Sequence, residues 1–131
     1  MEDKIKEIKE SDTGFIKNNE FKIIELNNKK CILEYKVKKN GLNPYSIVHG
    51  GILFGLADTC AGLLSTMNGF TPVTLDSNIS YLRNVSEGKI YAEAFILKEG
   101  KTIGFYKVEI KDENNNILSV VNINMYNKKI S

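Results

Sequence analysis

The stretch NPYSIVHGGILFGLADTCAGLLSTM (43–67) contains the residue types that could do chemistry. Asp58 is the only formally charged residue between Lys39 and Asp76 when the chain's single histidine, His49, is taken as neutral. Burying an unpaired carboxylate is costly. Such an aspartate therefore bonds to a hydroxyl or backbone group, faces water, or serves as a base or nucleophile.

The spacing of His49 and Asp58 limits how they could act together. They are nine residues apart, which on one helix is about 13 Å of rise and roughly half a turn out of phase. Two such side chains could hardly serve one substrate atom within a single chain. If both are catalytic, the site combines His49 of one subunit with Asp58 of another, and the spacing predicts a dimer.

The pair Gly50-Gly51 follows His49 where the expected helix begins. The first amides of a helix have no internal acceptor, and the helix dipole adds positive potential there. Glycine lets a ligand approach the backbone, so this place suits a carbonyl oxygen that gains negative charge during acyl transfer. A plain loop-to-helix turn is the alternative, and a Gly-Gly pair alone favours it.

The surrounding pattern predicts the elements that position these residues. Gly51 to about Asn68 is apolar on nearly every face, which predicts a buried helix of about five turns. Its glycines Gly55 and Gly62 each cost roughly 1 kcal/mol against alanine, so something should approach its backbone closely. Apolar runs and alternation of apolar and polar residues predict strands over 21–26, 30–38, 73–82, 89–98, 102–111 and 117–126.

Short turn signals separate the last four strands, so we expect antiparallel hairpins or near neighbours there. One flat sheet cannot cover a helix that is buried on all sides, whereas a curved antiparallel sheet can wrap around it. Residues 1–131 are therefore expected to form a single α+β domain. Within it, residues 1–20 form an N-terminal extension with a short helix, which the spacing of Ile5 and Ile8 weakly indicates.

Composition narrows the possible partners. A formal net charge of +2 gives no support for a nucleic-acid or membrane partner. The charged N-terminus shows no secretory signal, and two cysteines suggest no disulfide framework, so we expect a cytoplasmic protein. One histidine without clustered Cys, Asp or Glu leaves too few ligands for a metal. Cys60 is a possible nucleophile with His49, but nothing nearby would activate it, and a core role is favoured.

The motif around His49 resembles that of a known family. His49-Gly50-Gly51, with Asn43 six residues before and Asp58 nine after His49, is similar to the HGG signature of hotdog-fold thioesterases of the phenylacetate-degradation (PaaI-like) type. The similarity covers about residues 35–127, including VTLDSNISYLRNV (73–85) and KEGKTIGFYKVEI (98–110). It implies a hotdog fold, with a curved antiparallel β-sheet around one long central α-helix. It also implies cofactor-free hydrolysis of an acyl-CoA substrate by a homodimer, commonly paired into a homotetramer.

The resemblance also implies roles for single residues. Asp58 would be the general base or nucleophile at the thioester carbonyl, whose oxygen the Gly50 amide would polarise. Asn43 would place water or substrate, and His49 would hold the active-site loop and contact the thioester. The other substrate-binding positions would be Gly51, Thr74, Gly100, Lys101 and Thr102.

Some of these positions have a second interpretation. Thr74 falls where the family often has a hydroxyl beside the acid. Gly100-Lys101-Thr102 would lie near the CoA phosphates, although a hairpin turn with an exposed lysine explains them equally well. Asp76, Asn78 and Ser80 are expected on the strand face of Thr74 as a solvated or interface face, with Asp76 a weaker second candidate acid. Arg83 could supply positive charge for the nucleotide.

Two features depart from the family pattern. Ser46 stands where the family often has glycine, so the loop before His49 is expected to differ slightly. The chain starts close to its first strand, so we expect no long N-terminal contribution to the acyl pocket. Two other functions stay open: a non-catalytic acyl-CoA-binding sensor or carrier that uses the same pocket, and a hotdog dehydratase or hydratase. The second would need a His/Asp or His/Glu pair at the β-carbon of the acyl chain, and no such second motif is present.

Overall fold

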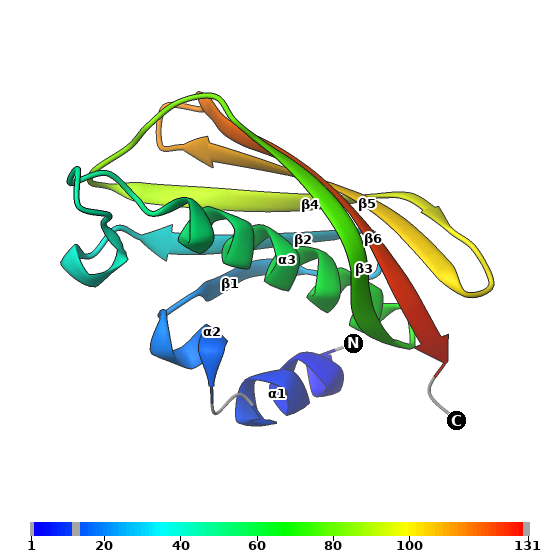
Figure 1. Ribbon diagram of the computed structural model, residues 1–131. Coiled ribbons are helices and arrows are strands. Elements are labelled where there is room, and N and C mark those ends of the chain that lie inside the picture. Colours follow the sequence, from blue (N-terminus) through cyan, green and yellow to red (C-terminus); the bar gives the residue numbers. More distant parts are fainter. Residues whose placement is uncertain (1, 12–13, 130–131) are drawn as a thin grey trace.

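A computed structural model describes residues 2–11 and 14–129, in which one six-stranded antiparallel sheet curves around a long helix (Figure 1). The strand order is β1-β2-β4-β5-β6-β3. This is the predicted hotdog architecture. The helices are α1 (Glu2–Ser11), α2 (Phe15–Asn18) and α3 (Gly50–Met67), with a short 3-10 helix over Lys39–Gly41. The strands are β1 (Lys22–Leu26), β2 (Lys30–Lys36), β3 (Phe70–Tyr81), β4 (Lys89–Glu99), β5 (Ile103–Asp112) and β6 (Ile117–Lys129).

Helix α3 lies on the concave face of the sheet because one of its sides is apolar throughout. Leu56, Cys60 and Leu64 on that side are fully buried. Among the described residues, α3 is the one helix long and apolar enough to cross a membrane, but here its apolar side packs on the sheet. The opposite side is less covered, and Asp58 there is only half-buried. Burial on all sides, as the sequence suggested, is therefore not reached within one chain.

The connections between strands agree only in part with the expectation. β4–β5 and β5–β6 are adjacent antiparallel pairs, as expected, but β3 and β4 are not neighbours. β3 pairs with β6 at one edge, while β4 lies between β2 and β5. The intervening chain passes the start of α3, where the Val48 amide donates to the Val85 carbonyl at 2.8 Å. A turn signal marks such a loop but does not tell which strand will be the next neighbour.

Strand β3 forms one of the two edges of the sheet, beside β6, and most of its side chains are exposed. It begins at Phe70 and includes Pro72, which an edge strand tolerates because the outer side of the edge needs no N–H donor. Several large apolar side chains are exposed on or directly after it: Val73, Leu75, Tyr81 and Leu82. An edge of this length and character is a surface on which another strand can pair.

A β-bulge divides β3 into two parts. The register shifts between Thr74 and Asp76, so Leu75 is the extra residue. Thr74 pairs with buried Met125 and faces α3, whereas Asp76 pairs with Asn124 on the other face. The expectation that Asp76, Asn78 and Ser80 share the face of Thr74 is therefore wrong, because the bulge reverses the alternation between them.

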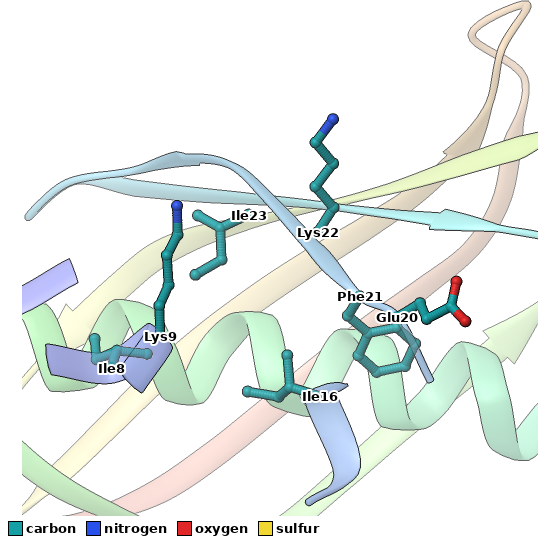
Figure 2. Close-up of a pocket in the computed structure, with 7 residues that line it drawn as sticks. All are labelled: Ile8, Lys9, Ile16, Glu20, Phe21, Lys22 and Ile23. Atoms are coloured by element: carbon teal, nitrogen blue, oxygen red, sulfur yellow. The ribbon is translucent and has the colours of Figure 1, made fainter. Parts of the chain in front are cut away.

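The N-terminal helices pack against the core, which the sequence did not predict. Ile8 and Ile16 point toward β1 around Phe21 (Figure 2). The ring of Phe15 lies on α3, where a Cβ added at Gly55 would come within 2.7 Å of its Cζ. This contact is the close approach expected at Gly55. At Gly62 an added Cβ would meet only a methyl group at 3.9 Å, so no comparable approach occurs there.

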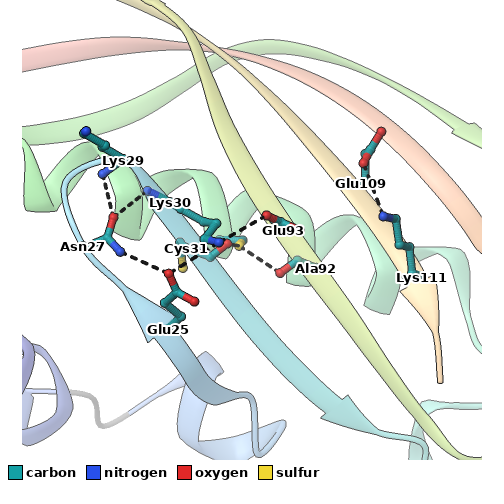
Figure 3. A network of polar contacts seen from close by, with 10 residues as sticks. Glu25, Asn27, Lys29, Lys30, Cys31, Ala92, Glu93, Glu109 and Lys111 are labelled. Carbon is teal, nitrogen blue, oxygen red and sulfur yellow. Dashed lines mark hydrogen bonds and ion pairs between the residues drawn. The ribbon is translucent and has the colours of Figure 1, made fainter. Parts of the chain in front are cut away.

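Polar contacts on the sheet join neighbouring strands. Lys30 on β2 pairs with Glu25 on β1 at 3.5 Å and with Glu93 on β4 at 3.9 Å (Figure 3). Partly exposed pairs of this kind contribute up to about 1 kcal/mol each. The cysteines belong to the interior instead. The Cys60 thiol is fully buried and donates to the Cys31 carbonyl at 3.2 Å, and burial raises the pKa of that thiol well above its usual value. Cys60 is therefore a core residue rather than a nucleophile.

Candidate active site

His49 caps the start of α3. Its backbone is extended (φ −61°, ψ 133°), and its Nδ1 accepts the Gly51 N–H at 2.8 Å. Because Nδ1 is the acceptor, the neutral ring carries its proton on Nε2 and can donate from there. A Cβ at position 51 would lie 2.9 Å from Nδ1, so the second glycine of the pair lets the cap close. The Gly51 amide is thus already used within the chain.

The Gly50 N–H, unlike that of Gly51, is not hydrogen-bonded to His49. Gly50 is the first residue of α3, and its N–H has no acceptor among the described residues. The Tyr81 hydroxyl donates to the Gly50 carbonyl at 3.0 Å, and an added Cβ would come within 3.1 Å of the Tyr81 ring. The first glycine is therefore fixed by Tyr81 while its N–H stays free to donate.

The loop before the helix is held by Asn43. Its Oδ1 accepts the Tyr45 amide at 2.9 Å and the Ile47 amide at 3.3 Å. Between them Ser46 has φ +63°, in the left-handed region where glycine is favoured. The departure from glycine at Ser46 therefore falls on the one loop residue with strained backbone. A role of Asn43 in placing water or substrate stays a prediction.

These residues meet in one cleft of about 360 Å³ at the start of α3. It is lined by Asn43, His49, Gly50 and Gly51 together with Tyr81, Arg83 and Asn84, among others. Arg83, the only arginine of the chain, is its sole formal charge, and no carboxylate of the described residues lines it. No role was assigned to Tyr81 from the sequence. The one signal that pointed to it was its place in the VTLDSNISYLRNV segment.

Asp58 and Thr74 form a second group. The Thr74 hydroxyl donates to Asp58 Oδ1 at 2.6 Å. Asp58 projects from the half-buried side of α3, and Thr74 from the face of β3 that is turned toward the helix. The hydroxyl thus lies beside the acid, where it can orient the carboxylate and leave its second oxygen free to accept a proton.

The structure does not bring all candidate residues together within one chain. Asp58 does not line the cleft at the start of α3, because it lies two turns further along the helix. Gly100, Lys101 and Thr102 form the β4–β5 turn at the opposite end of the sheet from the start of α3 (Figure 1). A single chain therefore holds the amide donor, the acid and the turn at three separate places.

Comparison with known proteins agrees with this architecture. The family model for the thioesterase superfamily matches residues 45–119. Human acyl-coenzyme A thioesterase 13 is 34% identical over 87 residues, which are 64% of this chain and 62% of that protein.

Two solved structures have the same fold. The thioesterase HI1161 from Haemophilus influenzae matches with a TM-score of 0.86 and 23% identity over 92% of this chain and 87% of that one. The protein smu.793 from Streptococcus mutans, solved bound to acetyl-CoA, matches with a TM-score of 0.81 and 25% identity over 83% and 89% of the two chains. The family match covers both the start of α3 and the Asp58–Thr74 pair, and the chain belongs to the thioesterase superfamily.

Proposed function

We propose that this protein is an acyl-CoA thioesterase of the PaaI-like type, with active sites built between two copies of the chain. One observation carries the proposal: the free Gly50 amide and the Asp58 carboxylate lie at different places in one chain. Each suits one half of thioester hydrolysis, the first as an oxyanion donor and the second as a base or nucleophile. A second copy can bring the two halves together.

The free edge of β3 supports a two-fold dimer. Two copies of an exposed, partly apolar edge can pair antiparallel about a two-fold axis. Such pairing sets the beginning of one β3 against the end of the other. Thr74 lies near the beginning of β3, and Tyr81, which contacts Gly50, is its last residue. The dimer would therefore bring Asp58 of one chain toward the partner's Gly50.

The chemistry then follows from the two halves. The thioester oxygen accepts the partner's Gly50 N–H, which stabilises the charge that this oxygen gains. Asp58 removes a proton from water as the water attacks the carbonyl carbon, and collapse of the tetrahedral intermediate breaks the C–S bond and releases CoA. In the alternative route Asp58 attacks first, CoA leaves, and water cleaves the acyl-aspartyl anhydride. Thr74 would hold the carboxylate in either route.

A CoA thioester as substrate is supported by the relatives, one named an acyl-CoA thioesterase and one solved with acetyl-CoA. For the β4–β5 turn, we propose that Gly100, Lys101 and Thr102 contact the CoA phosphates. Assembly of two dimers into a tetramer, a cytoplasmic location and one domain over residues 1–131 are part of the same proposal.

Replacing the acid tests the reaction. We expect the purified protein to hydrolyse members of a panel of aryl-, short- and long-chain acyl-CoAs. Asp58→Asn should lower kcat at least about hundredfold, as expected for loss of a general base, with an unchanged circular dichroism spectrum. A variant within threefold of the parent, or tight ester binding by the parent without any turnover, would refute catalysis by Asp58. The second result would point to a binding protein.

Isotope labelling can identify the nucleophilic route. In a single turnover in H₂¹⁸O, attack of water on the aspartyl carbonyl of the anhydride places ¹⁸O in the Asp58 carboxylate, and the free acid leaves with an unlabelled oxygen from Asp58. The general-base route leaves the Asp58 peptide unlabelled and labels only the free acid. Attack of water on the acyl carbonyl of the anhydride gives the same pattern, so label in the Asp58 peptide is the result that identifies the nucleophilic route. Mass spectrometry of the peptide that contains Asp58 reads the outcome directly.

A further inference from the structure

On the half-buried side of α3, an aromatic ring covers the helix next to Asp58. Gly55 lies one turn before Asp58 on the same side of the helix. The ring of Phe15 covers Gly55 closely, since a Cβ there would lie 2.7 Å from the ring. An aromatic side chain thus stands on the helix next to the candidate acid. A glycine in the interior of α3 makes that contact possible.

Behind Phe15 lies an apolar pocket that the proposed reaction does not use. The Phe15 ring meets the Phe21 ring edge-to-face, with centroids 5.5 Å apart. Phe21 lines a pocket of about 310 Å³ between β1 and the N-terminal helices, together with Ile8, Ile16 and Ile23 (Figure 2). A continuous series of contacts therefore leads from the turn before Asp58, through Phe15, to this pocket.

The lining of the pocket suits an acyl chain. Four of its seven lining side chains are isoleucine or phenylalanine, which methylene groups can contact. The charged lining residues are Lys9, Lys22 and Glu20, and the Glu20 carboxylate pairs with Lys38 at 3.5 Å. Burial of methylene groups against the isoleucine and phenylalanine side chains favours binding of an acyl chain.

We infer that Phe15 ends the acyl site in front of Asp58, so that the preferred substrates are CoA esters of short apolar acids. Removal of the Phe15 ring gives a longer chain room beside Phe21, toward the pocket that Phe21 lines. This inference rests on the proposed thioesterase activity and deepens it by naming the class of acyl group. Phe15 acts on specificity, whereas the chemistry stays with Asp58 and the partner's Gly50.

Removing the ring is a practical test because Phe15 is 53% exposed and α2 has no buried residues. The experiment measures kcat/KM for straight-chain acyl-CoAs from butyryl to dodecanoyl with the full-length protein, Phe15→Ala and Phe15→Ala/Ile8→Trp. Phe105→Ala is the matched control, since Phe105 is 38% exposed on β5, where it pairs with Asn124 on the face away from α3.

The parent should favour the short esters. In Phe15→Ala the ratio of dodecanoyl to butyryl kcat/KM should rise at least about tenfold, within the range by which apolar pockets discriminate. Ile8→Trp fills the pocket and should cancel that gain, while Phe105→Ala leaves the ratio unchanged. Chain-length profiles that coincide for the parent and Phe15→Ala would overturn the inference. A gain that survives Ile8→Trp would overturn it too.

Hydrolysis of the esters by the parent with no shift in Phe15→Ala would refute only the role of Phe15. A parent protein that hydrolyses none of the esters would instead refute the proposed activity. The two failures are therefore distinguishable in the same set of assays.

Discussion

The start of α3 and the side of the molecule that carries Asp58 are built in opposite ways. At the start of α3, Asn43 holds the loop, His49 closes the cap, and Tyr81 fixes Gly50. Every contact there comes from the same chain, and the Gly50 amide stays free. Around Asp58 the only side-chain hydrogen bond among the described residues comes from Thr74, on an exposed edge strand.

This difference indicates which half of the site one chain completes by itself. Donors to an oxyanion must be fixed before the charge develops, and the helix start meets that requirement in one chain. Among the described residues, nothing apart from Phe15 on one side covers Asp58, which borders the strand β3, whose outer edge is unpaired. In the proposed dimer, the second copy completes this side of the site.

The largest effect is expected from charge on the free edge. Leu75 is 53% exposed at the β3 bulge, and Leu75→Glu would add two negative charges to the proposed two-fold interface, where Asp76 follows on the same strand. In the proposed dimer the halves of each site lie in different chains, so we expect a monomer whose hydrolysis rate is at least about a thousandfold lower at dilute concentration. Light scattering after size exclusion gives the mass, and a thiol-release assay gives the rate.

Leu97→Glu is the matched control for that variant. Leu97 is 60% exposed and also lies at a register shift, between Ile96 and Lys98 on β4, away from the free edge. This variant should keep the parent's mass and rate. A monomeric Leu75→Glu protein with full activity would show that one chain suffices for catalysis.

The next effect concerns the donor at the helix start. Gly50→Pro removes the N–H, while proline is well tolerated at the first helical position. His49 already has the extended backbone (φ −61°, ψ 133°) that a residue before proline requires. We expect kcat to fall about 10²- to 10³-fold, the usual cost of losing one oxyanion donor. Thermal unfolding shows whether the fold is kept.

Gly50→Ala distinguishes the effect of losing the N–H from the effect of added bulk at position 50. Alanine brings a Cβ to the same place near Tyr81 but keeps the N–H, so its kcat should stay close to that of the parent. If both variants lose activity equally, crowding against Tyr81 explains the loss and the amide has no special part.

The sequence predicted most helices and strands correctly, but it did not predict the arrangement of the edge strand β3 or of the contacts at the start of α3. The apolar run from Gly51 predicted α3 because a core helix needs little beyond continuous hydrophobicity. Alternation predicted the strands, since one face of each is buried. β3 is exposed on both faces along most of its length, so no burial pattern marked the bulge at Leu75. Asp76 was placed on the wrong face for that reason.

The candidate site was predictable to a similar degree. The pairing of Thr74 with Asp58 was expected from the family resemblance, and the structure places the hydroxyl beside the acid. The use of Gly51 by His49, and of Gly50 by Tyr81, depends on three-dimensional contacts that no local pattern contains. The packing of Phe15 on Gly55 is of the same kind: the glycine indicated a close approach, but not which side chain makes it.

The smallest effect is expected from loss of the hydrogen bond between Thr74 on β3 and Asp58 on α3. Thr74→Val keeps the shape of the side chain and removes the hydroxyl that donates to Asp58 Oδ1. A hydrogen bond to a charged group contributes about 1.5–3 kcal/mol, and part of it is replaced by water at this exposed edge. We therefore expect kcat to fall about tenfold, or about 1.4 kcal/mol, with little change in KM. Thr74→Ser restores the donor and should restore most of kcat. If serine is as slow as valine, the hydroxyl alone does not restore the rate, and the open side of the site would depend on packing of the Thr74 methyl group as well as on orientation of the carboxylate.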